Sequence, residues 1–470
     1  MSERVALLAV DAGTSGCRTA AFDGQGRLLH EHAVPYQPRL GPDGRAEQPL
    51  DVVEEAMVAG LRAVAGRLGS RRPLALAADA QLGLVLHDAD GCPLGDALTW
   101  QDHRADAEAA RLGATLGRDW LYEVTGRRPS GEQVGPKIRW FADHEPARHA
   151  RIRHLLSLKD HLVWRLTGQY VTDVTHASYS LLADIRANRW QPDLLAAMAV
   201  SPEMLPPIRS AGDVAGGLRR EIAAAVGLPA GLPVAVGGSD GSVGCLGAGL
   251  TRPGVAVDVA GTSDVVFILA DRPLLDPEAR LVRNAFLIPG LWSIGGPTGL
   301  TGGCLEWFIE AFPPPGDPAR SPYERMEAAV AAVPAGSEGL RIFPNLSGSR
   351  APGWDPTARG AITGLTPTHG WGHFARAIME GVAAQVAEIV SLAEAAGAHV
   401  DEVRLVGGGS RSATWRQIRA QALGRSLHVV EGGSLTGSAM IAGITAGRYG
   451  SLGQAAAAFE TARHSVRVDV

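Results

Sequence analysis

The sequence predicts two α/β domains with a cleft between them, and two observations lead to this fold class. One short phrase occurs twice, at 9–15 and at 257–263, once in each half of the chain. In both copies a β-rich apolar run ends in Gly-Thr-Ser and resumes as another apolar run, which is typical of a strand, a tight turn and a second strand. Strand-like runs also alternate with helical spacing in both halves, and this alternation is typical of α/β domains.

Length and composition agree with this class. A chain of 470 residues fits two domains of ordinary size, and 46% apolar with 20% charged residues is typical of a soluble globular enzyme. The net charge of -5 argues against nucleic acid as a main partner. No apolar stretch approaches a membrane span, and the N-terminus enters the first strand with no room for a signal peptide. The four cysteines lack metal-type spacing, so we expect reduced thiols and a cytoplasmic protein.

The first half of the chain predicts strands and helices in a clear order. Residues 5–32 predict three short strands, with Asp-Gly-Gln-Gly at 23–26 as the second turn. The elements expected after them are a helix over 50–68, a strand region over 74–86, helices over 102–116, 137–143 and 155–166, a strand over 234–236 and a small-residue helix to 250.

The second copy of the phrase starts a new cycle directly after Arg-Pro-Gly at 252–254. We therefore expect a domain boundary near residue 248, with domains at 1–247 and 248–470. The Pro-rich segment 312–318 predicts a loop within the second domain. A long amphipathic helix over 374–396 then precedes a strand over 403–406 and a glycine triplet at 407–409.

Two such turns that face each other would form a cradle for a polyphosphate, because clustered backbone N–H groups form anion-binding concavities. Two unrelated hairpins are the alternative, since Gly-Thr-Ser is a common tripeptide. The Asp shared by both copies and the even split of the chain favour duplication. Asp258, however, precedes its Gly-Thr by one residue more than Asp11 does, so we do not expect the same role for it.

Individual residues near these turns suggest chemistry, each with a plainer alternative. Asp11 could hold a divalent metal beside the phosphates or simply cap a turn. Arg18, on the opposite strand of the hairpin, could meet a phosphate or be a solvated strand residue. Asp240 ends a buried strand between Gly238 and Gly241. There it could accept a proton from a substrate hydroxyl as general base, or serve as a helix N-cap.

Two further segments carry polar groups of the required kinds. The glycine triplet at 407–409, with Ser410, admits close approach of a flat ring or a phosphate, although such triplets also occur as plain turns. Residues 100–104 combine Trp, Asp and Arg at every second position. This set suits hydroxyl binding, and its alternative is an exposed helix start with an intrahelical ion pair.

Together these motifs resemble the FGGY family of carbohydrate kinases, within the ribonuclease H-like, actin-like ATPase superfamily. The resemblance covers effectively the whole chain in the family's order. Its most specific part is the second family signature over 360–380, which is satisfied at every constrained position. The first signature, around Lys137, fails at Glu132 and Val134. That region borders the sugar pocket in the family, so the departure concerns the identity of the sugar.

The resemblance implies specific roles for residues of this chain, with ATP and Mg²⁺ as cofactors. Asp240 would be the catalytic base, and Asp11 would assist the magnesium together with Asp240. The other implied positions are the first phosphate loop at Thr14, Ser15 and Arg18, the second at Thr262, nucleotide contacts at Gly302, Glu306, Gly408 and Ser412, and substrate contacts at Gln81, Leu82, Asp102 and Asp240.

The sugar is less well defined than the reaction. Xylulose kinases resemble the 74–86 region but have Met-His where this chain has Gln81-Leu82, and glycerol kinases have Arg-Glu there. D-xylulose is the leading substrate, with gluconate, another pentulose or a polyol as alternatives, and a homodimer is left open. Two other classes compete: an actin-like ATPase without a sugar substrate, and a catalytically silent sugar-binding relative.

Overall fold

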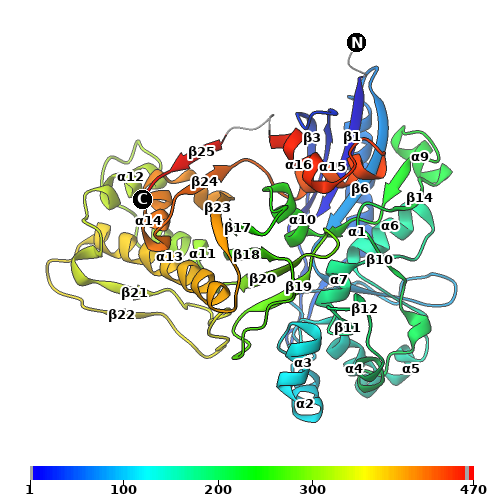
Figure 1. Ribbon diagram of the computed structural model, residues 1–470, viewed down its shortest axis with the longest axis horizontal. Coiled ribbons are helices and arrows are strands. Elements are labelled where there is room, and N and C mark those ends of the chain that lie inside the picture. Colours follow the sequence, from blue (N-terminus) through cyan, green and yellow to red (C-terminus); the bar gives the residue numbers. More distant parts are fainter. Residues whose placement is uncertain (1–3, 461–464) are drawn as a thin grey trace. The chain divides into compact units, whose positions relative to one another are not determined.

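The computed structural model describes residues 4–460 and 465–470, which divide into two compact units. The first unit comprises Met1–Thr251, Asn284–Trp292 and Gly432–Arg463, and the second comprises Arg252–Arg283, Ser293–Glu431 and His464–Val470. Each unit contains a mixed sheet with helices packed against it (Figure 1). The fold is thus α/β throughout, as the sequence predicts.

The main sheet of the first unit has the order β14-β15-β6-β1-β2-β3, with β16 beside β6. In it β1 pairs antiparallel with β2 and parallel with β6, so that Asp11 lies opposite both Arg18 and Asp79. The strands are β1 (Val5–Ala12), β2 (Gly16–Phe22), β3 (Leu28–Pro35), β6 (Arg72–Ala80), β14 (Val214–Gly217), β15 (Pro233–Ala235) and β16 (Gly238–Ser239).

Smaller sheets extend the first unit. A sheet of order β4-β5-β8-β7-β9 and the pairs β10-β13 and β11-β12 lie between the main elements in sequence. Their strands are β4 (Arg39–Leu40), β5 (Ala46–Gln48), β7 (Gly83–His87), β8 (Ala97–Thr99), β9 (His154–Leu156), β10 (Thr172–Asp173), β11 (Ala183–Asp184), β12 (Arg189–Trp190) and β13 (Ile208–Arg209).

Helices cover the sheets of the first unit. In α1 the buried Val53, Met57 and Leu61 recur at helical spacing and join the same hydrophobic core as Leu8 and Val10 of β1. The helices are α1 (Leu50–Ala65), α2 (Asp106–Leu116), α3 (Arg118–Thr125), α4 (Val134–His144), α5 (Pro146–His149), α6 (Leu158–Thr167), α7 (Val174–Tyr179), α8 (Pro192–Ala197), η1 (Pro202–Met204), α9 (Arg220–Val226), α10 (Asp240–Gly247), α15 (Ser434–Thr445) and α16 (Leu452–Glu460).

The second unit repeats the central pattern of the first. Its sheet has the order β19-β20-β18-β17-β23-β24-β25, in which β17 pairs antiparallel with β18 and parallel with β23. The strands of this sheet are β17 (Gly254–Val259), β18 (Val265–Ala270), β19 (Val282–Ala285), β20 (Trp292–Pro297), β23 (Val400–Val406), β24 (Leu427–Val430) and β25 (Ser465–Val468), and a separate hairpin consists of β21 (Arg341–Phe343) and β22 (Ala361–Thr363). Part of β19 and the first residue of β20 fall within Asn284–Trp292, which is counted with the first unit.

The helices of the second unit follow the strands in the predicted alternation. The long amphipathic helix expected over 374–396 is α13, and its buried Val386, Ile389 and Val390 pack in one core with Ala256 of β17. The set is α11 (Gly302–Ala311), α12 (Pro322–Ala331), α13 (Trp371–Ala395) and α14 (Ala413–Leu423), with the short 3₁₀ turns η2 (Ser337–Gly339) and η3 (Gly408–Arg411).

The last two helices, α15 and α16, belong to a different unit from the one that the predicted division into 1–247 and 248–470 gives them. Gly432–Arg463 belongs to the first unit, and Figure 1 shows α15 and α16, in red, beside the blue strand β1. The physical reason is burial, because Ala439, Met440 and Ile441 of α15 are fully buried and need an apolar surface. The first break, after Thr251, lies close to the predicted boundary.

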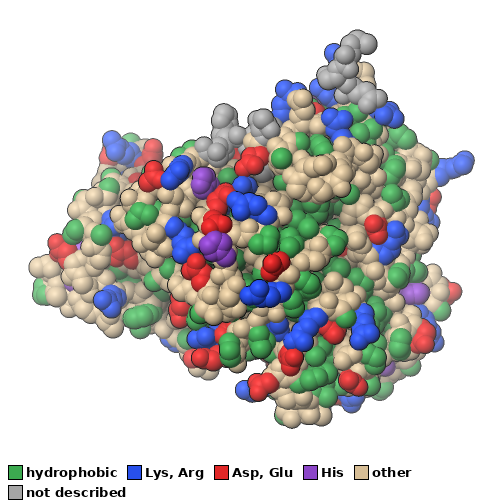
Figure 2. Space-filling view, viewed as in Figure 1, with side chains coloured by type: hydrophobic (Ala, Val, Ile, Leu, Met, Phe, Trp, Pro, Cys, Tyr) green, Lys and Arg blue, Asp and Glu red, His purple; other side chains and the backbone are tan. Residues whose placement is uncertain are grey.

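Side chains of both charges are interspersed over the face drawn in Figure 2. This agrees with the near balance of 44 Lys and Arg against 49 Asp and Glu. Within the described part of the chain, no helix is both long and apolar enough to cross a membrane.

Candidate active site

The first Gly-Thr-Ser turn joins β1 to β2 and is the centre of a polar network. The Thr14 hydroxyl donates to Gln81 Oε1 at 3.0 Å and accepts from Trp100 Nε1 at 3.1 Å. Tyr36 donates its hydroxyl to the Gly13 carbonyl at 2.9 Å. The predicted phosphate-loop residue Thr14 is therefore bound directly to Gln81, a predicted substrate contact. Ser15, also predicted for this loop, is exposed at the tip of the turn.

Asp11, at the end of β1, belongs to a cluster of acids. Arg18 Nε donates to Asp11 Oδ2 at 3.1 Å from a side chain that is 49% exposed. Across the parallel ladder lies Asp79, which is fully buried and accepts from Ser438 Oγ of α15 at 2.6 Å. Burial, and then the charge of Asp11, raise the pKa of Asp79 well above its ordinary value. Its burial beside Asp11 thus favours the neutral form of Asp79.

Asp240, the predicted base, is the first residue of α10 and is partly buried. Gly237 makes the turn before it, with φ of 76° and with so little space that a Cβ would lie 2.0 Å from the Ala78 carbonyl oxygen. Gly241 N donates to Asp240 Oδ1 at 2.7 Å. Burial and then the charge of Asp11 raise the pKa of Asp240 to about 7. A carboxylate with this pKa can exchange a proton near neutral pH.

Buried polar contacts fix the strand that leads into Asp240. Lys159 Nζ donates to the Val236 carbonyl at 2.9 Å and lies 3.1 Å from Asp173 Oδ1. The backbone N–H of Ser239 donates to Thr175 Oγ1 at 3.0 Å. Lys159 and Asp173 are fully buried, so these contacts hold the backbone directly before Asp240 away from solvent.

Asp102 and Leu82, the remaining predicted substrate residues, have different surroundings. The Asp102 carboxylate is fully buried, accepting from Arg104 Nη2 at 2.7 Å and from the Ala46 backbone N–H at 2.9 Å. Leu82 is partly buried and follows Gln81 directly. Near them Lys137 donates to the Thr99 carbonyl at 2.7 Å, and burial lowers its pKa to about 8. In this structure Asp102 therefore holds a loop through Arg104.

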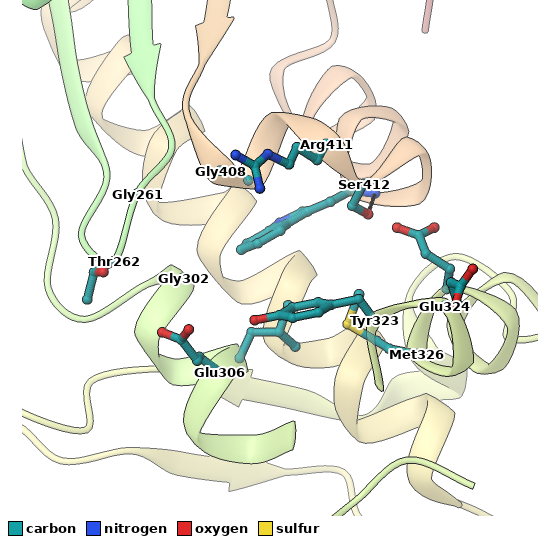
Figure 3. Close-up of a pocket in the computed structure, with 14 residues that line it drawn as sticks. Gly261, Thr262, Gly302, Glu306, Tyr323, Glu324, Met326, Gly408, Arg411 and Ser412 are labelled. Carbon is teal, nitrogen blue, oxygen red and sulfur yellow. Dashed lines mark hydrogen bonds between the residues drawn. The ribbon is translucent and has the colours of Figure 1, made fainter. Parts of the chain in front are cut away.

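The second unit contains a cavity of about 650 Å³, a size suited to a small-molecule ligand. The five nucleotide contacts predicted in this half of the chain all line it: Thr262, Gly302, Glu306, Gly408 and Ser412. Figure 3 shows Gly408 and Ser412 on one wall, Tyr323 and Met326 on the opposite wall, and Thr262 at one end. The cavity lining also includes Trp415 and the acidic Glu324 and Glu327.

The second Gly-Thr-Ser turn is tied to the start of α11. The Thr262 carbonyl accepts from Thr301 N at 3.0 Å and from Gly303 N at 3.1 Å. At Gly302 a Cβ would lie 2.1 Å from the Gly261 carbonyl oxygen, so only glycine permits this approach. At the start of α14, Ser412 caps the helix by accepting from Trp415 N at 3.0 Å. Two helix N-termini, at which anions are favoured, thus border the cavity.

Sequence reasoning missed several residues of these sites. Asp79 carried a signal, because it is an acid inside the otherwise apolar run of β6. Trp415 carried a weaker one as an aromatic residue shortly after the glycine triplet. Ser438 carried none, since it meets Asp79 across 359 positions of sequence.

The acids around Asp11 fit a hard divalent cation. Within residues 4–460 and 465–470, no group of three or more His, Cys, Asp or Glu forms a ready metal-binding set. Magnesium, however, is usually held by one or two carboxylates together with water and substrate phosphates. Asp79 Oδ1 is buried without a hydrogen-bond partner. A cation would offset the charge of Asp11, which acts after burial in raising the pKa of Asp240.

The repeated unit of an antiparallel hairpin beside a parallel strand, with a glycine-rich turn in each copy, is the architecture of the actin-like ATPase class. The comparisons with known proteins narrow this class. The chain belongs to the FGGY family of carbohydrate kinases, whose N-terminal domain matches residues 6–247 and whose C-terminal domain matches residues 256–446. It is therefore a carbohydrate kinase, a transferase that uses ATP.

Individual relatives cover nearly the whole chain. The xylulose kinase of Bacillus subtilis (strain 168) is 29% identical over 96% of this chain and 91% of its own length. A gluconokinase of Bacillus licheniformis is 26% identical (88% and 82%), and a glycerol kinase of Nocardia farcinica is 31% identical (82% and 77%). The crystal structure of xylulose kinase from Rhodospirillum rubrum superimposes with a TM-score of 0.91 at 28% identity, covering 99% of this chain and 94% of that one.

Proposed function

We propose that the protein transfers the terminal phosphate of ATP to a hydroxyl of an open-chain ketopentose, with D-xylulose as the leading substrate. The observation that carries the proposal is Asp240, a partly buried acid whose pKa of about 7 suits a general base. It projects from the same unit as the network of Thr14, Gln81 and Trp100, which offers polar groups for sugar hydroxyls.

In the proposed reaction, Asp240 accepts the proton of the substrate hydroxyl as its oxygen attacks the terminal phosphorus. The bond from that phosphorus to the bridging oxygen breaks, and ADP leaves with the electron pair. Catalysis of phosphoryl transfer consists mostly of positioning and of stabilising phosphate charge. The chain supplies the positioning through the buried Lys159 and Asp173, which hold the strand before Asp240.

We assign nucleotide binding to the cavity of the second unit. Thr262, together with the N-termini of α11 and α14, offers hydroxyl and N–H donors suited to phosphate oxygens. Tyr323 and Trp415 offer flat apolar faces for a base. Thr14, Ser15 and Arg18 are proposed to contact phosphate from the first unit.

Asp11 and Asp240 are the residues that we expect to hold Mg²⁺. When bound, the ion would neutralise phosphate charge and orient the transferring group. Without it, the contact with Arg18 holds the Asp11 carboxylate in place.

D-xylulose is favoured because relatives named xylulose kinase align over nearly the whole chain, and one such solved structure shares the fold at 28% identity. Gluconate, another pentulose or a polyol is the second candidate, supported by the gluconokinase and glycerol kinase relatives. Gln81 and Leu82 are the side chains that we expect to decide among them. A cytoplasmic location and a homodimer remain predictions.

A coupled assay of ADP release tests the proposal across pentuloses, hexuloses, polyols and aldonic acids. We expect D-xylulose to give the highest kcat/KM, and Asp240→Asn to remove the sugar-dependent rate. A different preferred sugar would replace the substrate assignment and leave the kinase reaction intact. ADP release that is the same with and without every sugar would favour an ATPase instead.

A further inference from the structure

A buried ion triad lies directly behind the second Gly-Thr-Ser turn. Arg419 of α14 is fully buried, and its guanidinium lies between the carboxylates of Asp258 and Asp264. Nη1 donates to Asp258 Oδ2 at 2.5 Å, and Nη2 lies 2.7 Å from Asp264 Oδ2. Asp258 precedes the turn in β17, and Asp264 follows it just before β18. Arg419 therefore joins the two ends of the turn that carries Thr262.

The same triad also fixes the beginning of α11. The Thr301 hydroxyl donates to Asp264 Oδ1 at 2.9 Å and accepts from Asp264 N at 2.8 Å. The next residue, Gly302, lines the cavity and touches the turn. A displacement of Asp264 would therefore move both the turn and the helix start that border the phosphate end of the proposed nucleotide site.

Arg419 also contacts Trp415, a residue that lines the cavity. Its Cζ lies 4.8 Å from the ring centroid of Trp415, one helical turn earlier in α14. Trp415 lines the cavity, and its backbone N–H donates to the capping Ser412. One guanidinium thus connects the two ends of the Thr262 turn with Trp415, and both Thr262 and Trp415 line the cavity.

Stability alone does not account for this arrangement. Buried charges are costly to remove from water, and well-packed apolar residues of similar volume often serve stability equally well. Burial opposes the charged form of Arg419, yet Asp258 and Asp264 raise its pKa, so the side chain stays protonated. Its use of two nitrogens on two carboxylates and of its flat face on a ring is a combination that Lys cannot provide.

We propose that Arg419 is a positioning residue that fixes the separation between the Thr262 turn and Trp415, so that a nucleotide whose base lies against Trp415 reaches the turn with its phosphates. Arg419 itself touches no substrate. The proposal rests on the nucleotide site assigned above. It adds that Arg419 sets the distance between the two ends of that site.

Calorimetric titration with ADP and with AMP tests this role. AMP occupies the base end but lacks the β-phosphate, so the ratio of the two dissociation constants measures how well the turn is placed. In Arg419→Lys we expect AMP binding within about twofold of wild type and ADP binding weakened about tenfold, since small misplacements have large effects at such sites. The KM for ATP should rise while the KM for the sugar stays unchanged. Arg416→Lys, in the same helix, is the matched control and should keep the wild-type ratio.

A second variant guards against simple misfolding. Arg419→Met combined with Asp258→Asn and Asp264→Asn leaves no unpaired buried charge, and its thermal midpoint reports folding. In this triple variant we also expect ADP to lose its advantage over AMP in the ratio of the two dissociation constants. A wild-type ratio in this folded variant, or an equal loss of ADP and AMP binding in Arg419→Lys, would overturn the proposal. Sugar-dependent ADP release by the wild type is measured separately, so failure of the proposed reaction is distinguishable.

Discussion

At the first Gly-Thr-Ser turn, Asp11 pairs with Arg18, whose side chain is 49% exposed, and faces the buried Asp79. At the second turn, Asp258 pairs with Arg419, whose side chain is fully buried and also balances Asp264. Both acids end the first strand of the same kind of hairpin, beside a parallel strand in each unit. The backbone is repeated, whereas the surroundings of the acid are not.

The difference shows how a repeated backbone arrangement can hold two kinds of side-chain environment. Near the first turn, burial and then the charge of Asp11 raise the pKa of Asp240 to about 7, and Asp79 Oδ1 is buried without a hydrogen-bond partner. Such a region suits proton transfer and cation binding. Behind the second turn, one cation joins two acids and a ring, an arrangement that suits the holding of geometry.

Removal of the proposed base, Asp240, should have the largest effect on turnover. A small effect would contradict the contrast between the two turns. In Asp240→Asn we expect kcat to fall by about 10²- to 10⁴-fold, because the hydroxyl loses its proton acceptor. Calorimetry should show ADP binding unchanged. Asp193→Asn, an exposed acid at the start of α8, is the matched control. Turnover near that of the wild type in Asp240→Asn would contradict the assignment.

Replacement of Asp11 and of Asp258 by Asn, one at a time, tests whether the two turns differ in function. Since the charge of Asp11 raises the pKa of Asp240, Asp11→Asn should lower that pKa. The base then stays ionised at lower pH, and the acid limb of the kcat/KM profile should move down by about 1 pH unit. Asp258→Asn should leave the limb in place and lower the thermal midpoint. The same limb in wild type and Asp11→Asn would show that the first turn does not tune the base.

Substitution of Gly302, where the backbone of the second turn lies very close, should have a smaller effect that is confined to ATP binding. A Cβ there would lie 2.1 Å from the Gly261 carbonyl oxygen, so Gly302→Ala must push the second turn aside. We expect the KM for ATP to rise about tenfold while the KM for the sugar is unchanged. Gly370→Ala in the same unit, where nothing lies within 4 Å of the new Cβ, serves as control. A rise in the sugar KM alone would contradict this role.

His87 lies outside both turns, and its titration should have the smallest effect of those considered. That effect should be on stability and not on activity. Burial, and then the charges of His161 and His154, lower the pKa of His87 to about 4. The unfolded chain takes up this proton near pH 6.5, so stability should fall as pH drops from about 6.5 to 4. The raised pKa of Asp240 works in the opposite direction, because the folded state binds that proton more readily. Thermal melts of His87→Gln should show a shallower acid slope, and an unchanged slope would assign the acid sensitivity elsewhere.

Local sequence patterns predicted the hairpins and the longest helix. Apolar runs around a tight turn and sustained helical spacing specify these structures with few contacts to distant parts of the chain. The helix expected over 155–166 begins only at Leu158, since His154–Leu156 pairs as β9 with β7. The helix expected over 102–116 begins at Asp106, since the carboxylate of Asp102 is held by Arg104 and the Ala46 N–H in a loop. Tertiary pairing decided both boundaries.

The grouping of Thr262 and Gly408 around one cavity follows from topology that the sequence indicates. Each residue follows the carboxyl end of a strand, and β17 and β23 are parallel neighbours, so both strand ends meet at one edge. The contact of Asp79 with Ser438 could not be predicted in this way, because it depends on where a distant helix packs. The Arg419 triad likewise joins a helix to a hairpin through side chains that have no shared motif.

The return of α15 has a consequence for how the chain is made. Its buried Ala439, Met440 and Ile441 belong to the first unit, and Ser438 satisfies Asp79 inside that unit. During synthesis from the N-terminus, the first unit therefore lacks one of its own layers until α15 has left the ribosome. A nascent chain stalled before α15 would expose the apolar face of β1 and β6 and should require chaperone protection.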